Sequence, residues 1–347
     1  MKSSLAFLFV AVSGGILGGC QSTTMNVEPA IVFARSETSE RSYHLQPLAT
    51  GRQPVALAMP RFAGNVQTAP RAGVMAANVG AAGSGSAALA VFSPGADRAN
   101  DRVVVAEWAW DFSLREDGAA IAFIAGREQR RLFVAAAPTW KAVAVALPAD
   151  ATPSAPRWLG AGRLLVVLHR SGGSELGVLT VATSELRTVY RAAAGHVLSD
   201  PSPAGENADA IVIESASENS PGRLLRVALA GGEPRVLARG YFLPGSLVVS
   251  PDGRFVGAVW SGDADAVRRR VAAFQWAGET WGGVPREVAG VTSAVWSSDG
   301  TSLAVARQSE ARRWIEVYAA DQAGAPPRAI GFAGATCFAP QWWQPRP

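Results

Sequence analysis

SPDGRFVGAVW (residues 250–260) and SSDGTSLAVAR (residues 297–307) are two copies of one phrase, and their starts are 297 − 250 = 47 residues apart. Each copy has an Asp-Gly turn followed by a run that is mostly apolar. Asp and Gly are favoured in tight turns, and a short apolar or alternating run is typical of a strand. A third copy, LREDGAAIAFIA (residues 114–125), precedes the first by three similar steps, because Gly253 − Gly118 is 135, or 3 × 45. The chain therefore repeats.

Tryptophans ahead of these turns follow a similar period. Trp158 − Trp110 is 48, Trp296 − Trp158 is 138 (3 × 46), and Trp342 − Trp296 is 46. Within one period, residues 291–331 read as four short strands separated by turn signals. Since a thin sheet with apolar residues on both faces needs neighbours on each side, the repeat predicts an all-β protein built of four-stranded propeller blades.

The repeats resemble those of TolB-type (PD40, or WD40-like) β-propellers, in which a Pro-x-Trp-Ser-Pro-Asp-Gly turn opens each blade. The matching residues are Ser250, Pro251, Asp252, Gly253, Trp296, Ser297, Asp299, Gly300, Trp110, Ser113, Asp117, Gly118, Pro156 and Trp158. The resemblance covers residues 110–347 well and the N-terminal part less well. It implies six or seven blades. A non-propeller pair of β-sandwiches is the alternative.

The two ends of the propeller region look like parts of one blade. Residues 340–343 (PQWW) have the character of an opening strand, whereas residues 30–58 have the character of the remaining strands. We therefore expect the N- and C-terminal strands to pair and close the ring, which removes free sheet edges. Residues 59–109, which include a low-complexity Ala/Gly/Ser stretch at 72–90, form either a seventh blade or a long insertion.

The first twenty residues, MKSSLAFLFVAVSGGILGGC, have the layout of an export signal. Their apolar run is too short to span a membrane, which takes about 20 apolar residues. Leu17-Gly18-Gly19-Cys20 resembles the bacterial lipobox, which implies lipidation of Cys20; a plain secretory signal is the alternative. We expect a signal peptide at 1–19, a tether at 20–28 and one propeller domain at 29–347. Gln21 favours the outer membrane over the inner membrane. We expect the protein on the periplasmic face of the outer membrane, with the inner membrane and the cell surface as alternatives.

Composition excludes several classes of function. The formal net charge is +4, or +3 once Lys2 is removed with residues 1–19, so no nucleic-acid-binding surface is expected. If Cys20 is lipidated, Cys337 has no cysteine left to pair with, and we interpret it as a small buried residue. Three arginine clusters (residues 130–131, 268–270 and 312–313) lie near expected hairpin turns and are interpreted as solvated charges.

No stretch carries an established catalytic or metal-binding pattern. The histidines, His44, His169 and His196, have no second ligand at metal spacing, so neither metal nor cofactor is expected. Asp263 and Asp265 form an Asp-x-Asp that we interpret as a solvated hairpin. The turn residues Asp117, Gly118, Asp252, Gly253, Asp299 and Gly300 are expected to be structural, as are the tryptophans, which we expect between neighbouring blades.

The sequence favours a non-enzymatic lipoprotein that acts as a protein–protein interaction scaffold in the cell envelope. It would be held to the membrane by its lipid and would bind an envelope protein or peptide. One alternative is a hydrolase or lactonase with ligands converging at the channel. Another is a module that binds cell-wall polysaccharide through exposed aromatic residues, for which Trp276 and Trp281 are candidates.

Replacing Cys20 with Ser tests the lipid anchor. The variant is expected to leave the membrane fraction for the soluble fraction, because the acyl chains that hold the protein attach to the cysteine sulfur and N-terminus. Fractionation of cell envelopes followed by immunoblotting measures the change. Undiminished membrane retention of the Ser variant would contradict the prediction.

Overall fold

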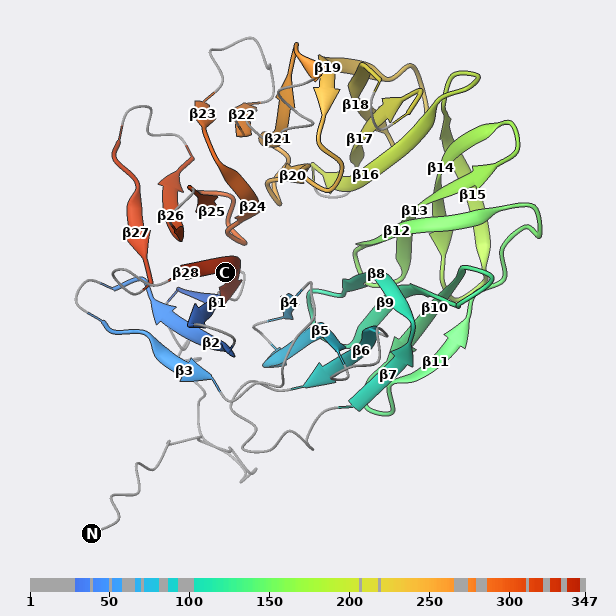
Figure 1. Cartoon of the computed structure of the whole chain (residues 1–347). Coiled ribbons are helices and arrows are strands. Elements are labelled where there is room, and N and C mark those ends of the chain that lie inside the picture. The colour runs from blue at the N-terminus through green and yellow to red at the C-terminus, as the bar shows by residue number, and fades with distance from the viewer. Residues whose placement is uncertain are drawn as a thin grey trace, which may run out of the picture.

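A computed structural model describes residues 29–37, 40–49, 52–57, 66–69, 72–80, 87–92, 103–205, 208–217, 220–264, 274–278, 286–309, 312–320, 325–331 and 336–343. Within these residues, 28 strands are arranged as seven four-stranded antiparallel blades around a central axis (Figure 1). The predicted all-β propeller is confirmed, and seven is the number of blades among the described residues. No helix in the described part of the chain has the length and apolar character needed to cross a membrane.

The blades are numbered here from the N-terminus, each with its innermost strand first. Blade 1 is β28 (Thr336–Trp343), β1 (Ala30–Glu37), β2 (Glu40–Pro47) and β3 (Val55–Leu57). Blade 2 is β4 (Val66–Ala69), β5 (Val74–Gly80), β6 (Ala87–Phe92) and β7 (Val103–Glu107). Blade 3 is β8 (Ala109–Leu114), β9 (Ala120–Ala125), β10 (Arg131–Ala136) and β11 (Lys141–Ala144). Blade 4 is β12 (Thr152–Leu159), β13 (Arg163–Arg170), β14 (Gly173–Thr180) and β15 (Glu185–Arg191).

The remaining blades follow the same order. Blade 5 is β16 (Val197–Ala204), β17 (Asp209–Ser215), β18 (Gly222–Ala228) and β19 (Arg235–Phe242). Blade 6 is β20 (Val248–Val249), β21 (Phe255–Ser261), β22 (Phe274–Gly278) and β23 (Arg286–Val288). Blade 7 is β24 (Val291–Trp296), β25 (Ser302–Gln308), β26 (Arg313–Ala319) and β27 (Arg328–Ile330). The end of β19 also pairs with β21, which joins blades 5 and 6 into one sheet.

The two ends of the described chain share blade 1, as expected from the sequence. β28 pairs antiparallel with β1, from Ala30 opposite Trp343 to Ser36 opposite Thr336. Along the axis, each innermost strand contacts the next, and β28 contacts both β24 of blade 7 and β4 of blade 2. Residues 66–107 contain blade 2, so the Ala/Gly/Ser-rich stretch contributes β5 and the start of β6 to a blade and is not a loop insertion.

In three blades, an Asp-Gly turn links the first strand to the second. In each of them the aspartate carboxylate accepts a hydrogen bond from the N–H two residues further on. In blade 6, the Asp252 carboxylate accepts the N–H of Arg254 at 3.0 Å and the hydroxyl of Ser250 at 2.6 Å. In blade 7, Asp299 accepts the N–H of Thr301 at 3.0 Å and the hydroxyl of Ser297 at 2.6 Å. In blade 3, Asp117 accepts the N–H of Ala119 at 2.9 Å. Each aspartate therefore holds a tight turn closed.

The glycine that follows each aspartate packs against the turn of the preceding blade. Gly253 has φ +72°, and a Cβ added there would lie 2.3 Å from the backbone nitrogen of Gly205 in blade 5. A Cβ on Gly118 would lie 2.4 Å from the Cβ of Ala72 in blade 2, and one on Gly300 would lie 3.0 Å from the Asp252 carboxylate. The turns are thus blade-to-blade contacts as well as strand connections.

Tryptophans make further contacts between blades. The indole N–H of Trp158 in blade 4 donates to the carbonyl of Ser113 in blade 3 at 2.8 Å. Trp342 in blade 1 donates in the same way to Val295 in blade 7 at 2.9 Å, while Trp296 is buried and stacks on Phe255 of blade 6. These indoles lie between blades, as expected.

The spacing of the tryptophans predicted that Trp110 lies buried between two blades, and this prediction is wrong. Its side chain is 41% exposed, and the guanidinium of Arg130 lies 5.4 Å from its ring centre. Leu114 pairs with Ile121 as the last pair before the turn, just as Trp296 pairs with Leu303. Leu114 is therefore the counterpart of Trp296 in blade 3, and the 48-residue interval that included Trp110 was a coincidence.

A buried carboxylate ties blade 4 to blade 5. The side chain of Glu214 in β17 is fully buried. It accepts the hydroxyl of Tyr190 from β15 at 2.7 Å, the N–H of Ala193 at 2.8 Å and the guanidinium of Arg223 at 2.7 Å. Burial opposes ionisation, but these three donors outweigh it and hold the pKa of Glu214 below its usual value.

Alanine substitutions at Gly253 and Gly160 separate backbone strain from contact between blades. Both glycines have similar positive φ angles, +72° and +65°, but a Cβ on Gly160 meets nothing within 4 Å. Gly160→Ala is expected to cost about 1 kcal/mol of unfolding free energy, because L-residues disfavour this region. Gly253→Ala should cost about 1–3 kcal/mol more, since the methyl group must displace the Gly205 backbone.

Denaturant unfolding monitored by tryptophan fluorescence measures both free energies. Equal costs at the two positions would contradict the predicted packing of the Asp-Gly turns against one another.

Candidate functional site

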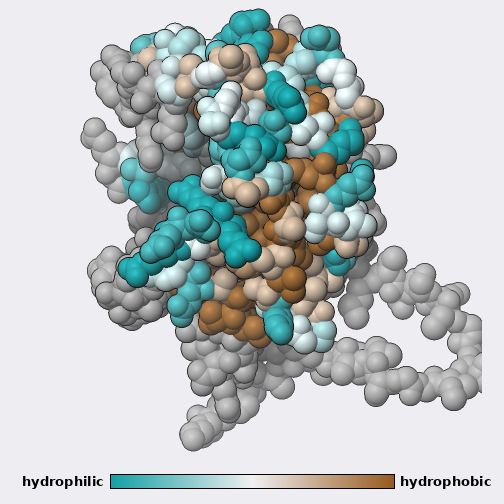
Figure 2. Space-filling model, turned by 90° about the vertical axis from the view of Figure 1, so that its right-hand side faces the viewer, coloured by the Kyte–Doolittle hydropathy of each residue, from teal (hydrophilic) through white to brown (hydrophobic). Residues whose placement is uncertain are grey.

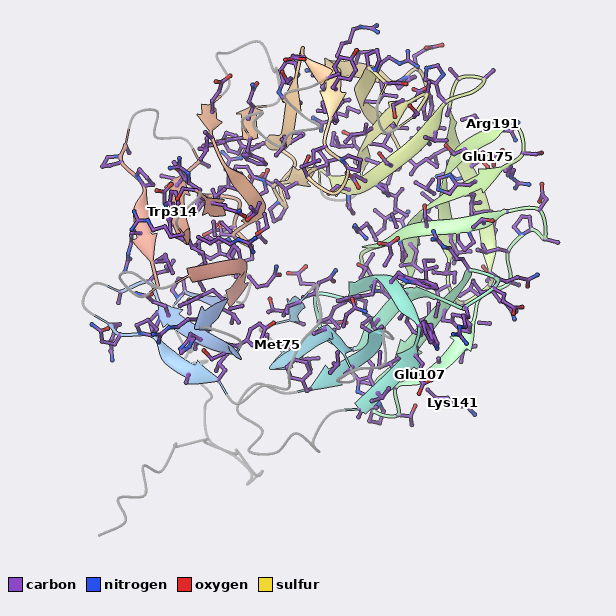
Figure 3. All side chains as sticks on the ribbon, viewed as in Figure 1. Met75, Glu107, Lys141, Glu175, Arg191 and Trp314 are labelled. Carbon is purple, nitrogen blue, oxygen red and sulfur yellow. The ribbon has the colours of Figure 1, made fainter. Side chains whose placement is uncertain are left out.

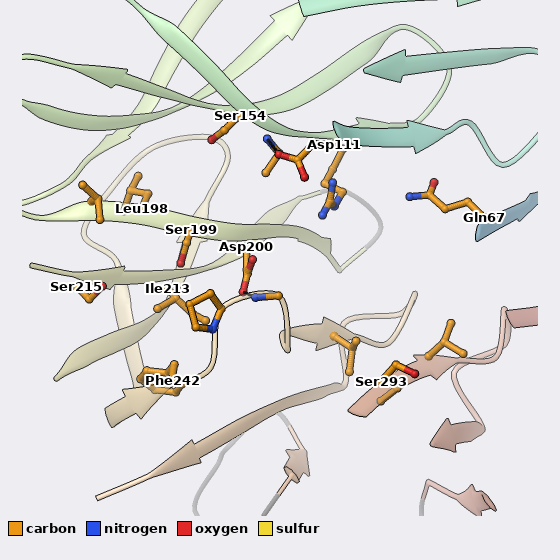
Figure 4. A pocket seen from close by; sticks show the side chains of 18 of the residues that line it. Gln67, Asp111, Ser154, Leu198, Ser199, Asp200, Ile213, Ser215, Phe242 and Ser293 are labelled. Atoms are coloured by element: carbon orange, nitrogen blue, oxygen red, sulfur yellow. Dashed lines mark hydrogen bonds between the residues drawn. The ribbon is translucent and has the colours of Figure 1, made fainter. Parts of the chain in front are cut away.

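The innermost strands of all seven blades line a central cavity of about 760 Å³. One lining residue from each blade is Gln341, Gln67, Asp111, Arg157, Asp200, Val248 and Ser293, in order from blade 1 to blade 7. Figure 4 shows Gln67, Asp111, Ser199, Asp200 and Ser293 around this space. The pairs Glu175–Arg191 and Arg170–Asp150 lie elsewhere, and Figure 3 shows Glu175 and Arg191 towards the outside of blade 4.

The outer surface on the side of blades 3 and 4 carries side chains of mixed character. Figure 2 shows the side of the ring formed by blades 3 and 4, where hydrophilic and hydrophobic residues are intermixed. The exposed large apolar side chains among the described residues include Val103 and Val104 on β7 and Val143 on β11. Val197, another exposed apolar residue, lines the cavity, and the channel, to which all seven blades contribute, is the candidate site.

Bulges in the innermost strands shape the channel. The pairing register shifts between Ala109 and Phe112 in β8, between Ser154 and Arg157 in β12, and between Ser199 and Ser202 in β16. Ala155 and Asp200 lie within two of these bulges and have φ angles of +46° and +51°. Non-glycine residues in this conformation are strained, and such strain is concentrated at functional sites. Bulges also re-aim backbone groups.

Three charged side chains from consecutive blades face this space. Asp111 in β8 and Asp200 in β16 lie on either side of Arg157 in β12. Burial raises the pKa of Asp200, although the bond from the N–H of Gly245 and the charge of Arg157 lower it. Burial lowers the pKa of Arg157, although Asp111 and Asp200 raise it. Ionised Asp200 therefore carries a stability cost above its raised pKa, which disappears as the pH falls through that pKa.

A serine and a histidine also meet at the cavity wall. The Ser154 hydroxyl and His169 Nε2 are 2.8 Å apart. Burial and the charge of Arg130 lower the pKa of His169, so the imidazole is neutral at pH 7. Acyl transfer also requires a group that orients the histidine and donors for an oxyanion. No described carboxylate is hydrogen-bonded to His169, and the pair therefore forms an incomplete nucleophilic site.

The sequence-predicted residues are scattered over the molecule. The turn residues Asp117, Asp252 and Asp299 follow β8, β20 and β24 and do not line the cavity. His44 is buried in β2, and His196 is bonded within its own loop. Asp263 is exposed in the loop after β21, and Asp265 lies outside the described residues. Cys337 lies in β28, but its side chain is outside the description; Cys20 is outside it altogether.

The aromatic candidate for polysaccharide binding is wrong at Trp276. Its side chain is only 2% exposed and packs between Phe274 and Tyr318. Trp281 lies outside the described residues. Among His, Cys, Asp and Glu in the described ranges, no three come together in a group that could hold a metal ion.

Sequence reasoning did not identify the channel residues Asp111, Arg157 and Asp200. They are 46 and 43 residues apart (157 − 111 and 200 − 157), and no local motif connects them. A usable signal was present in Ala-Pro at 155–156, Asp-Pro at 200–201 and Ala-Pro at 339–340. Proline lacks an N–H and within sheets marks edges or bulges, so these pairs mark places where an innermost strand leaves regular pairing.

No protein-family model and no curated protein matches this sequence. Solved structures do match. A prolyl endopeptidase has a TM-score of 0.63 at 10% identity, covering 90% of this chain and 50% of that one. Oligogalacturonate lyase of Vibrio parahaemolyticus has a TM-score of 0.61 at 10% identity, covering 84% and 87%. TolB of Acinetobacter baumannii has a TM-score of 0.48 at 12% identity, covering 90% and 66%.

These identities show likeness of fold alone. The chain spans half the length of the endopeptidase and about two thirds of the length of TolB. The predicted β-propeller is confirmed as the fold. Since enzymes share this fold, it does not decide between a scaffold and an enzyme.

Proposed function

We propose that this protein is a non-enzymatic interaction scaffold whose channel holds an extended segment of a partner protein. The observation that carries the proposal is the cavity of about 760 Å³ to which all seven innermost strands contribute. A site built from seven blades in one ring is held rigid by every contact between neighbouring blades. Because such a site is already ordered, binding does not carry the entropic cost of ordering it.

The chemistry of the lining suits a peptide backbone. Ser199, Ser215 and Ser293 line the cavity with hydroxyl groups, each of which can donate and accept a hydrogen bond. Asp111 and Asp200 add acceptors, and Arg157 adds donors. An extended peptide presents one N–H and one C=O per residue, so it needs both kinds of partner. Small-molecule sites are more often predominantly apolar.

The proposed setting is the periplasmic face of the outer membrane, with Cys20 carrying the lipid. The sequence motif at residues 17–20 supports this address, and the partner would be another envelope protein. A channel partner and a lipid anchor act together, because anchoring restricts the search for the partner to a thin layer above the membrane and raises its effective concentration.

Photocrosslinking from the channel tests this function. A diazirine-bearing residue replaces Ser199 or Ser293 in the full lipoprotein, and a matched control replaces Val143, which is 63% exposed on the outer strand β11. After irradiation of living cells, both channel positions are expected to form adducts with adjacent residues of one partner segment, identified by mass spectrometry. Val143 should not label that segment.

Two outcomes would contradict the scaffold. One is the absence of protein adducts at both channel positions. The other is equal labelling of the same proteins from the channel and from Val143, which indicates random collision at the surface.

A further inference from the structure

Carboxylates in the bulges of two innermost strands tie neighbouring blades together across the channel wall; Asp111 is the second residue of its bulge and Asp200 the first. Asp111 of β8 accepts the N–H of Ala155 in blade 4 at 3.4 Å, 44 residues further on. Asp200 of β16 accepts the N–H of Gly245, which precedes β20 of blade 6, at 2.5 Å, 45 residues further on. The same bond therefore joins blade 3 to blade 4 and blade 5 to blade 6.

The junction between blades 4 and 5 has no such tie. The two bulge residues of β12 are Ala155, the counterpart of Asp200, and Pro156, the counterpart of Asp111. Neither side chain carries an acceptor. Among the described side chains, none accepts the N–H of Asp200. A bond of this kind is thus missing at this junction.

The backbone at Asp200 matches the backbone at Ala155. Both residues lie in a bulge, have φ angles of +51° and +46°, and are followed by proline. β12 and β16 also share one pattern of burial along their eight residues. Since the N–H of Ala155 reaches towards blade 3, the N–H of Asp200 reaches in the equivalent direction, towards Ala155 in blade 4.

Arg157 adds a second donor at this junction. Its guanidinium lines the cavity, and its hydrogen bond goes to the carbonyl of Pro156, next to it in the chain. No carboxylate in the described part of the chain lies within salt-bridge distance of it. Arginine stays charged in proteins, so N–H groups remain available for an acceptor that enters the channel.

We propose that the junction of β12 and β16, called here the Ala155 subsite, receives a main-chain carbonyl of the bound partner segment. This inference rests on the proposed function. The carbonyl oxygen takes the place of the carboxylate that Asp111 and Asp200 supply at their own junctions, and accepts from the Asp200 N–H and Arg157. Ala155 is then the specificity-determining residue, because its short side chain leaves the place open.

Charge decides between a carbonyl and a carboxylate as the acceptor. Among the described residues that line the cavity, the acidic groups of Asp111 and Asp200 outnumber the single guanidinium of Arg157. An incoming carboxylate would be a third acidic group beside them, which like-charge repulsion disfavours. A neutral amide oxygen avoids that repulsion and still accepts two hydrogen bonds.

Filling the subsite from the protein itself tests the inference. Ala155→Asn places an amide oxygen on β12 at the position where Asp200 carries its carboxylate in β16, and asparagine tolerates this positive φ better than alanine. Ala155→Gly is the matched control, because it suits the same φ and leaves the subsite open. Neither variant is expected to unfold the protein.

The probe is a peptide selected from a random heptapeptide library on the full wild-type chain and shown to bind in the channel by crosslinking to Ser199 or Ser293 positions. Fluorescence anisotropy then gives its Kd. Ala155→Asn is expected to weaken binding at least about tenfold. The new side chain fills the Ala155 subsite and takes the hydrogen bond that the Asp200 N–H would donate to the peptide carbonyl. Ala155→Gly should stay within about threefold of wild type. Equal affinity for wild type and Ala155→Asn would overturn the inference.

The subsite is also measurable without any ligand. In ¹⁵N-Asp-labelled protein, the amide proton of Asp200 should shift downfield and exchange more slowly in Ala155→Asn than in wild type or Ala155→Gly. An Asp200 amide that is unchanged by Ala155→Asn would overturn the inference whatever the peptides do. Failure of every selected peptide to bind in the channel would count against the proposed function, whereas the amide measurement would still decide the subsite.

Discussion

Hydrogen bonds between β1 and β28 are the interaction on which the ring depends. Each blade has one face covered by the blade before it and the other by the blade after it, so an open row of blades would leave two apolar faces uncovered. It would also leave the unpaired edges of β1 and β28 exposed. Pairing of residues 30–36 with residues 336–343 places both chain ends in blade 1, between blades 7 and 2. The contacts of β28 with blades 7 and 2 therefore hold both chain ends in the ring.

The contacts between blades are of several kinds, and this matters for the channel. Tight turns pack through Gly118, Gly253 and Gly300, indoles bond across at Trp158 and Trp342, and Glu214 is buried between blades 4 and 5. With the ring held by these contacts, the innermost strands carry bulges and the strained residues Ala155 and Asp200. The contacts between blades thus stabilise the ring, while the strained and less stable backbone lies at the channel. This is the distribution expected of a binding site.

Much of the fold could be predicted because a propeller repeats its turns in the sequence. The phase of the Asp-Gly turns placed the strands of blades 3, 6 and 7, and the composition of the two ends indicated their pairing. Blade 2 was ambiguous because its strands are built of alanine, glycine and valine, whose small side chains give little alternation. Trp110 was misassigned because a spacing argument cannot distinguish a buried indole from an exposed one four residues earlier than the true position, Leu114.

The candidate site was much harder to predict. Asp111, Arg157 and Asp200 meet only because three blades bring them to one axis, and the sequence holds no local pattern for such a meeting. Their roles become visible when equivalent positions are compared between blades. Ala155 matters because its counterpart in blade 5, Asp200, carries a carboxylate where Ala155 carries only a methyl group.

Residue-resolved hydrogen exchange of β1 tests the central claim, that the two chain ends close one ring around the channel. In an antiparallel sheet, alternate amides of β1 point to β2 and to β28. The account predicts that the amides of residues 31–35 are all protected to the same degree as those of β25, which is paired on both sides. Alternate amides of β1 that exchange as fast as the unpaired side of the outer strand β11 would contradict it.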